Sequence, residues 1–300
     1  MKKVLFTASE AVPFIKTGGL ADVVGSLPKY FSKKNYDIRV MIPKYSDIGE
    51  EFTKQMHYMD HFYMDLNWRQ QYVGIFELEY GGIKFYFIDN EEHFAGPRPY
   101  MGIPEDLEKF AFFSKASLSA LPTIGFRPDI IHCHDWQTGM IPALLRQQYQ
   151  QLPAYRNIRT LFTIHNLSYQ GVFPWATIDA LLGFGEKHFT PERLEFYGCI
   201  SFMKGGLVFS DAISTVSKTY AEEIKTTYFG EQLDGLLRKR AGDLYGILNG
   251  IDAAQYDPAT NQHLEAHYTP EDLSGKATNK EWLQRDLGLA LSPDTPLIAM

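Results

Sequence analysis

The sequence has little cysteine, no long apolar run and no basic cluster, and each absence excludes a class of protein. Two cysteines in 300 residues, Cys133 and Cys199, are too few for the disulfide framework of a small secreted domain. No apolar stretch approaches the roughly 20 residues that a membrane-spanning helix needs. No signal or transit segment precedes the first apolar run, at residues 4–7. We therefore expect a cytoplasmic protein with no membrane partner.

The charge and composition of the chain also indicate which classes of binding partner to expect. The chain has 29 basic and 36 acidic side chains, a formal net charge of −7, and the basic residues are dispersed. This balance argues against a nucleic-acid partner and for a small molecule or a neutral polymer. Apolar residues make up 45% and charged residues 22% of the chain, so we expect a sizeable core and no extended disorder.

Short apolar runs alternate with amphipathic stretches along most of the chain. Such alternation favours an α/β fold with a Rossmann-like parallel sheet flanked by helices. The expected strands are residues 4–7, 38–42, 84–88, 130–133, 160–164, 212–216 and 244–248. The expected helices include 107–121, 139–149, 202–209 and 219–228. Residues 52–88 are rich in aromatic and β-branched side chains and contain Gly81-Gly82, so we expect an antiparallel ribbon there.

The last part of the sequence predicts a second domain. A polar stretch at 257–279 precedes a helix-like segment at 280–287, and a new apolar run begins at 296 and continues to 300. We expect one domain at 1–290 and the start of a truncated second domain at 291–300. The alternative is an edge strand that closes the first domain.

A pair of glycines stands where the first expected strand leads into a helix. Gly18 and Gly19 follow Lys16, and from Leu20 onward apolar residues recur at helical spacing until Pro28, which we expect to kink or shorten the helix. In open α/β sheets, ligands bind beyond the carboxyl ends of the strands. Free N–H groups at a helix N-terminus favour a phosphate, and the lysine adds a cation. The alternative is an ordinary glycine turn beside a surface lysine.

Two histidines and a carboxylate follow the expected strand 130–133. Alternation places His132 and His134 on one side of the strand and Cys133 on the other. Asp135 can accept hydrogen bonds from sugar hydroxyls, and Trp136 offers an apolar face to a pyranose ring. A metal site is one alternative. The others are hydrogen-bonded core histidines, a core tryptophan and an aspartate that caps the next helix.

Polar residues also follow later strands. Strand 160–164 leads into His165 and Asn166, and strand 244–248 leads into Asn249. Alone, His165 would be an ordinary core histidine and Asn249 part of an Asn-Gly turn. Ser217, after strand 212–216, is expected only to cap the next helix.

Five strings of this sequence resemble glycogen and starch synthases. They are residues 16–23 (KTGGLADV), 162–171 (FTIHNLSYQG), 203–207 (MKGGL), 210–217 (SDAISTVS) and 246–252 (GILNGID). They fall in order on successive strand ends, and the resemblance spans nearly the whole chain.

The resemblance implies the N-terminal domain of a bacterial, ADP-glucose-type synthase with the GT-B fold, facing a second α/β domain. Such an enzyme transfers glucose from ADP-glucose to the non-reducing 4-hydroxyl of an α-1,4-glucan (glycogen or a maltooligosaccharide), with retention at the anomeric carbon. It implies no metal and no cofactor. Because the second domain would bind much of the donor, we expect this chain alone to be inactive.

The resemblance also implies roles for individual residues. Catalytic roles are expected for His165 and Asp135. Donor binding is expected for Lys16, Gly18, Gly19 and Asn249. Acceptor binding is expected for Glu10, Asp22, Tyr100, Trp136 and Asn166. One stretch departs from the family, which usually has Asp-Asn-x-Glu-Arg-Phe shortly after its tyrosine, where residues 105–110 here read Glu-Asp-Leu-Glu-Lys-Phe.

Two other classes of function compete. A glucan-binding domain without catalysis would leave Lys16, His165 and Asn249 without a reason to occur together. A nicotinamide-dependent oxidoreductase or epimerase would need a G-x-G-x-x-G fingerprint, which does not follow the first strand.

Overall fold

The computed structural model describes residues 1–102 and 104–298. The chain divides into two compact units, Met1–Asn249 and Gly250–Met300. This division lies earlier in the chain than the expected boundary at residue 290, and the assignment of domains to 1–290 and 291–300 stays a prediction.

The described part of the second unit is helical. It contains α10 (Ala253–Tyr256) and α11 (Ser274–Asp286), so the helix expected at 280–287 begins earlier than its pattern suggested. Residues 296–298 are in no strand. The expected continuation of an opening strand through Ala299 and Met300 lies outside the described residues.

The first unit is built on a nine-stranded sheet in the order β12-β11-β7-β6-β1-β2-β5-β4-β3. The strands from β12 to β5 pair in parallel, and β3 and β4 are antiparallel. The parallel strands are β1 (Lys2–Thr7), β2 (Tyr36–Pro43), β5 (Ile83–Asp89), β6 (Ile130–His134), β7 (Arg159–Ile164), β11 (Ala212–Thr215) and β12 (Leu244–Gly246). The expected strands and the parallel sheet are thus confirmed.

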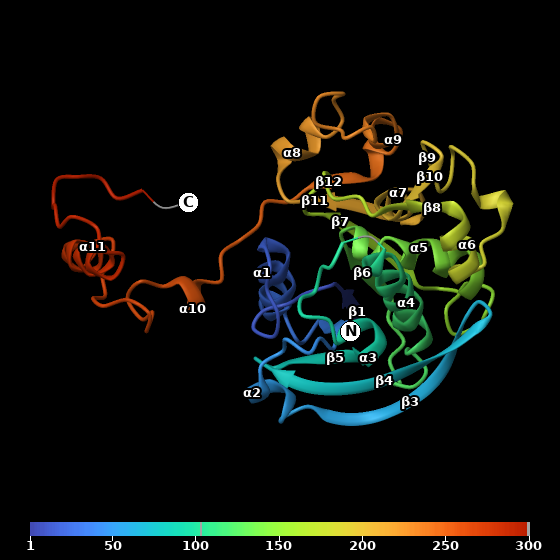
Figure 1. Ribbon diagram of the computed structural model, residues 1–300, viewed down its shortest axis with the longest axis horizontal. Coiled ribbons are helices and arrows are strands. Elements are labelled where there is room, and N and C mark those ends of the chain that lie inside the picture. The colour runs from blue at the N-terminus through green and yellow to red at the C-terminus, as the bar shows by residue number, and fades with distance from the viewer. Residues whose placement is uncertain (103, 299–300) are drawn as a thin grey trace. The chain divides into compact units, whose positions relative to one another are not determined.

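The expected antiparallel ribbon is confirmed as well. β3 (His57–Leu66) and β4 (Arg69–Tyr80) form the long ribbon at one edge of the sheet (Figure 1), and β4 turns through Gly81 and Gly82 into β5. Both glycines have positive φ, 59° and 72°, a conformation that side chains with a Cβ rarely adopt. A separate small sheet has the order β8-β10-β9, with β8 (Val172–Pro174), β9 (Glu195–Phe196) and β10 (Cys199–Ser201).

The helices of the first unit cover this sheet. They are α1 (Gly19–Ser26), α2 (Glu50–Thr53), α3 (Glu91–Phe94), α4 (Glu105–Ser119), α5 (Met140–Leu144), α6 (Trp175–Leu182), α7 (Phe202–Phe209), α8 (Lys218–Glu223) and α9 (Asp234–Lys239). α5 continues as one π-helical turn, Leu145–Tyr149. α1 ends before Pro28 and passes into a 3-10 turn, Leu27–Tyr30, as proline predicts. None of the described helices is long and apolar enough to cross a membrane.

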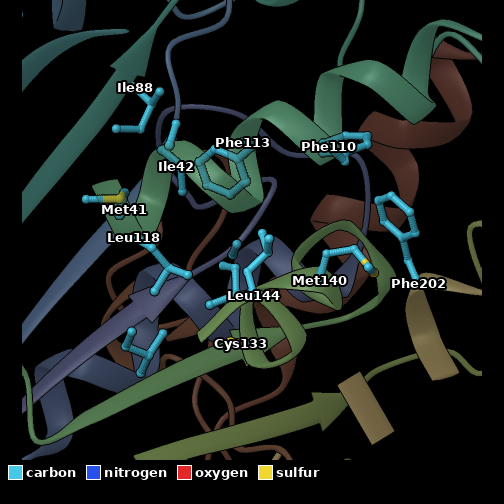
Figure 2. Packing of buried hydrophobic residues seen from close by; sticks show 14 of the residues in the cluster. Met41, Ile42, Ile88, Phe110, Phe113, Leu118, Cys133, Met140, Leu144 and Phe202 are labelled. Carbon is cyan, nitrogen blue, oxygen red and sulfur yellow. The ribbon is translucent and has the colours of Figure 1, made fainter. Parts of the chain in front are cut away.

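The core lies between the sheet and the packed helices α4, α5 and α7. Figure 2 shows Phe110 and Phe113 of α4 together with Met140 and Leu144 of α5, all fully buried. Each such side chain contributes about 1.5–3 kcal/mol on burial. In α7, a Cβ on Gly206 would lie 2.4 Å from the Phe162 ring of β7, so only glycine allows this helix to lie so close to the sheet.

Candidate active site

The expected site residues follow strands whose carboxyl ends meet at one edge of the sheet. β1 leads into the loop with Gly18 and Gly19, β6 into Asp135, β7 into His165, and β12 into Asn249. β7 lies between β6 and β11, and β12 pairs with β11. After β12 the chain stays beside β11, because the Asn249 N–H donates to the Val216 carbonyl at 3.3 Å.

A cavity of about 700 Å³ lies at this edge. Its wall contains most of the predicted site residues: Glu10, Gly18, Gly19, Tyr100, Asp135, Trp136, His165, Asn166 and Asn249. The wall also contains residues to which the sequence gave us no reason to assign a role: Thr17, Leu20, Gly102, Asp106, Gln137, Tyr169 and Val216. Of these, Thr17, Leu20 and Tyr169 lie inside the motifs that carry Gly18 and His165, which is the signal that could have found them.

Gly18 and Gly19 form the N-terminus of α1. Gly18 is the N-cap residue, and no side chain caps the helix, so backbone N–H groups at this end are available to a ligand. A Cβ built on either glycine has no atom within 4 Å. Neither packing nor a left-handed backbone therefore requires glycine here, since Gly18 has φ −155°. What a Cβ would occupy is space at the cavity.

Lys16 and Asp22 lie beside each other and are not among the residues of the cavity wall. The Lys16 ammonium group, in the loop before α1, donates to the carboxylate of Asp22 in the first turn of α1 at 2.8 Å, and the two side chains are 44% and 32% exposed. The predicted donor-binding lysine and the predicted acceptor-binding aspartate thus form an ion pair near the glycines. An exposed pair of this kind adds at most about 1 kcal/mol to stability.

Asp135 holds the loop that carries His165 by hydrogen bonds to its backbone. Its carboxylate accepts hydrogen bonds from the backbone N–H of His165 at 2.7 Å and of Asn166 at 3.4 Å. Asp135 precedes a 3-10 turn, Trp136–Thr138, but its side chain does not cap it. Its φ is +55°, a strained value for a non-glycine residue of the kind found at functional sites. Burial raises the pKa of Asp135 to about 7, although the hydrogen bonds from residues 165 and 166 oppose this.

A second acidic group of the wall is Glu10. The N–H and hydroxyl of Thr17 both donate to its carboxylate, which ties the start of the loop to the residue before Gly18. Burial raises the pKa of Glu10, while the two bonds from Thr17 lower it. The Glu10 charge in turn contributes to the raised pKa of Asp135. Glu10, Asp106 and Asp135 therefore place three carboxyl groups in the wall of a partly desolvated cavity.

Tyr100 reaches this wall from a different part of the chain. Its hydroxyl lies 2.8 Å from the Ser9 hydroxyl. The backbone N–H groups of Met101 and Gly102 donate to the Asp106 carboxylate, each at 2.9 Å, and the buried Lys109 ammonium joins Asp106 to the Pro99 carbonyl. The stretch that departs from the family pattern thus holds the tyrosine loop in place.

The histidines of β6 pack as core groups. His132 and His134 lie on one side of the strand with ring centroids 4.1 Å apart, and Cys133 is buried in the apolar cluster. Burial lowers the pKa of His132 to about 3 and that of His165 to about 4. Within the described residues, no group of three or more His, Cys, Asp or Glu side chains is arranged to hold a metal ion.

A second cavity of about 440 Å³ adjoins the first. The two share Gly102, Asp106, Trp136 and Tyr169. The remaining wall of the second cavity is formed by Ser168, Gln170, Gly171, Val172, Phe173, Phe196, Glu231 and Gln232. Trp136 has two roles here: its ring packs against Phe110 and Phe173, as a core tryptophan would, and its edge borders both cavities.

Comparison with known proteins matches both the sequence and the fold. The model of the starch synthase catalytic domain family matches residues 3–239. The chain is 55% identical to a glycogen synthase of Lachnospira eligens over 290 residues, which are 96% of this chain and 61% of that protein. It is 52% identical to a glycogen synthase of Geobacillus thermodenitrificans over 298 residues, 99% of this chain and again 61% of the relative.

A solved structure gives the same result. The catalytic domain of starch synthase IV from Arabidopsis thaliana, bound to ADP and acarbose, aligns with a TM-score of 0.87 at 31% identity, covering 96% of this chain and 59% of that one. The expected fold class, a Rossmann-like sheet of a GT-B glycosyltransferase with an antiparallel elaboration, is confirmed. The chain spans about three fifths of the length of these relatives, and on the family match and the identities it belongs to the starch synthase catalytic domain family.

Proposed function

We propose that this chain is the acceptor-side half of a glycogen synthase, a cytoplasmic enzyme that transfers glucose from ADP-glucose to the non-reducing end of an α-1,4-glucan with retention. One observation carries the proposal: Gly18 and Gly19 at a helix N-terminus share a single cavity with His165 and Asn249. Relatives above 50% identity are glycogen synthases, and the aligned starch synthase IV holds ADP and acarbose.

The glycine end of the cavity suits a diphosphate. Uncapped N–H groups and the dipole of α1 attract negative charge, and the open space at Gly18 and Gly19 admits a phosphate to van der Waals distance. Lys16 would exchange its bond to Asp22 for one to the phosphate. Preorganised donors of this type stabilise the charge that develops on the departing nucleotide.

The middle of the cavity suits the transferred glucose. His165, neutral because its pKa is about 4, would hydrogen-bond the sugar, with Asn249 of the same cavity wall as a further donor-site contact. Asp135 would act by holding the backbone at His165 and Asn166. No side chain is assigned as a nucleophile, so the proposed chemistry is front-face displacement of the nucleotide by the acceptor hydroxyl, without a metal.

The part of the cavity that adjoins the second cavity suits a chain of sugars. Glu10, Tyr100, Trp136 and Asn166 are wall residues of the first cavity, and Trp136 also lines the second cavity. Carboxylates and amides hydrogen-bond hydroxyl groups, and aromatic rings cover the apolar faces of pyranoses. A linear neutral polymer fits this arrangement better than a compact ligand does.

The remaining two fifths of the relatives' length would supply the rest of the donor site. We propose that a second α/β domain binds most of ADP-glucose and closes over the cavity, and that this chain alone is inactive. The alternative, a glucan-binding domain without catalysis, predicts the same glucan binding but no gain of turnover.

The experiment is a paired titration and assay. Isothermal titration calorimetry of the chain with maltoheptaose and with ADP-glucose should show glucan binding and weak donor binding. Radiolabelled glucose incorporation into glycogen should be at background for the chain alone and should appear when the remaining part of a close relative is fused after residue 300. Turnover by the isolated chain would contradict the two-domain proposal, and a fusion that folds and binds both ligands without turnover would favour the glucan-binding alternative.

A further inference from the structure

His134 lies behind His165 in the core. β6 and β7 run in parallel with His134 in register with Thr163, so the two rings meet just beyond the sheet. Nδ1 of His134 is 3.0 Å from Nε2 of His165, and the ring centroids are 5.3 Å apart. His134 is completely buried, whereas His165 lines the cavity. This hydrogen bond therefore connects the core to the cavity wall.

Both rings are neutral. Burial lowers the pKa of His165 to about 4. Burial lowers the pKa of His134 well below its ordinary value too, and the neighbouring rings of His132 and His165 lower it further. A neutral imidazole has one N–H donor and one bare acceptor nitrogen. A single hydrogen therefore lies between Nδ1 of His134 and Nε2 of His165.

The direction of this bond follows from the other nitrogen of His134. Nε2 of His134 is buried and has no hydrogen-bond partner. If Nε2 carried the hydrogen, a buried N–H donor would be left without an acceptor. If Nδ1 carries it, only a lone pair is left unpaired, and orphaned N–H groups are the rarer of the two in folded proteins. The network therefore assigns the hydrogen to Nδ1 of His134, and Nε2 of His165 accepts it.

Because Nε2 of His165 accepts this hydrogen bond, the single N–H hydrogen of the neutral His165 ring is on Nδ1. Within the described residues, the buried ring nitrogens without a partner are Nε2 of His93 and Nε2 of His134. Nδ1 of His165 is not one of them, and no described group bonds to it, so it is open to the cavity that His165 lines. His134 thereby determines which hydrogen-bonding group the cavity presents.

We propose that His134 is a positioning residue that holds His165 in the neutral Nδ1–H tautomer and so presents one fixed N–H donor to the cavity. The use of this donor, to an oxygen of the transferred glucose, rests on the proposed function. The tautomer itself does not. A donor that is already oriented before the sugar arrives needs no reorganisation when charge shifts during transfer.

His132 provides a matched control on the same face of β6. It is also buried, and its ring lies 4.1 Å from that of His134. Its hydrogen bond, however, goes to the Thr163 hydroxyl at 2.6 Å, which continues to the Ser214 hydroxyl at 2.7 Å. Replacing His132 perturbs the same core without removing the partner of His165.

The test is the tautomer of His165, read from ¹⁵N chemical shifts in a long-range ¹H–¹⁵N correlation of the labelled chain at pH 7. We expect a protonated-type shift for Nδ1 and a bare-type shift for Nε2. A His165→Asn variant identifies the resonances. A bare Nδ1, or a shift averaged between the two types, overturns the proposal. Neither result depends on catalysis, so failure here is distinct from failure of the proposed function.

Variants at residue 134 distinguish the effect of the His134 hydrogen bond on the His165 tautomer from the effect of the His134 ring on core packing. His134→Phe keeps the ring but removes both nitrogens, and we expect the His165 shifts to move to the average of two tautomers. His134→Asn places an amide near the former Nδ1 and should restore the Nδ1–H pattern, while His132→Asn should leave it unchanged. If His134→Phe retains the pattern of the parent, the proposal is wrong. If that variant does not fold, the parent spectrum and His134→Asn still decide.

Discussion

The Asp135 carboxylate accepts the backbone N–H of His165 at 2.7 Å and so joins the end of β6 to the first residue after β7. The bond links two neighbouring strand ends at the point where both line the cavity. Because it fixes the backbone rather than the imidazole, Asp135 and His134 hold His165 by separate contacts, one at its amide and one at its ring.

The pH dependence of stability should reveal the buried Asp135. Its pKa is about 7 in the folded chain against an ordinary value of 3.8, so between about pH 4 and pH 7 the folded state binds more protons than the unfolded state. The free energy of unfolding therefore falls in this window as pH rises. Asn does not titrate, so the stability of Asp135→Asn relative to the parent should rise from pH 4 to pH 7, by at most about 4 kcal/mol, and level off above. Urea unfolding across this range measures it.

Asp211 offers the control of opposite sign. Burial alone would raise its pKa, but hydrogen bonds from Arg159 and the Thr160 N–H and the ion pair with Arg146 outweigh this and lower it. The stability that Asp211 contributes is therefore present above its ordinary pKa and lost as pH falls below it. Asp211→Asn should be less stable than the parent at pH 7, with a deficit that shrinks only in acid. If the difference in the free energy of unfolding between Asp135→Asn and the parent did not change between pH 4 and pH 7, the Asp135 carboxyl group would not be buried as described.

The residues that could be located from the sequence share a local signal. Gly18, Asp135, His165 and Asn249 each follow a short apolar strand, and the carboxyl ends of parallel strands meet at one edge. That the strands are parallel needs only the alternation of apolar runs and helices. The structure accordingly brings these four together in one cavity, although their individual roles remain predictions.

The relationships that could not be located depend on contacts distant in sequence. The Lys16–Asp22 ion pair requires the direction in which the loop enters α1. The position of Tyr100 depends on the hydroxyl of Ser9 and on the bonds from its loop to Asp106. The sequence offers a helix cap as the alternative role of Asp135, but its carboxylate accepts the N–H of His165 at the neighbouring strand end, a partner that only the folded sheet supplies. Local propensity contains no information on any of these.

Two glycines of α1 should respond in opposite ways to the same substitution. A Cβ on Gly19 meets nothing within 4 Å, whereas a Cβ on Gly25 would lie 2.2 Å from the Val12 carbonyl. Gly19→Ala should therefore leave stability unchanged or raise it by up to about 1 kcal/mol, while weakening ADP-glucose binding. Gly25→Ala should destabilise the fold.

Thermal unfolding and donor titration together measure both effects. In the two-domain enzyme we expect Gly19→Ala to raise the Kd for ADP-glucose at least about 10-fold, the loss of one or two N–H contacts to a charged group. Binding unchanged by Gly19→Ala, with stability also unchanged, would separate these glycines from the phosphate.

Lys16 and Asp22 should differ in function although they form one ion pair. The pair is exposed, so Lys16→Gln and Asp22→Asn should each change the free energy of unfolding by less than about 1 kcal/mol. If Lys16 binds the diphosphate, Lys16→Gln should lower kcat/KM of the two-domain enzyme for ADP-glucose by about 10²-fold, whereas Asp22→Asn keeps the ammonium group and should change it little. Equal losses in the two variants would assign the lysine to the structure of the loop rather than to the donor.

The second cavity predicts a dependence on acceptor length through Glu231. This residue has φ +47° and is held by the Ser168 hydroxyl at 3.1 Å and by the Gln170 amide, which donates to its backbone carbonyl at 2.7 Å. The strained backbone keeps an exposed carboxylate at the wall beyond Trp136. A short acceptor would end before this wall, but a longer one would reach it.

If the second cavity holds the acceptor, Glu231→Ala in the two-domain enzyme should raise KM for maltoheptaose by about 3- to 10-fold, the loss of one hydrogen bond, with KM for maltose and kcat unchanged. Glu231→Gly removes the same carboxylate but relieves the positive φ, so it should show the same KM change with a gain of up to about 1 kcal/mol in stability. Initial rates over a series of maltooligosaccharides give the comparison. A KM that rises equally for maltose and maltoheptaose would place Glu231 outside an extended acceptor groove, because a contact made only by distant sugars cannot affect a disaccharide.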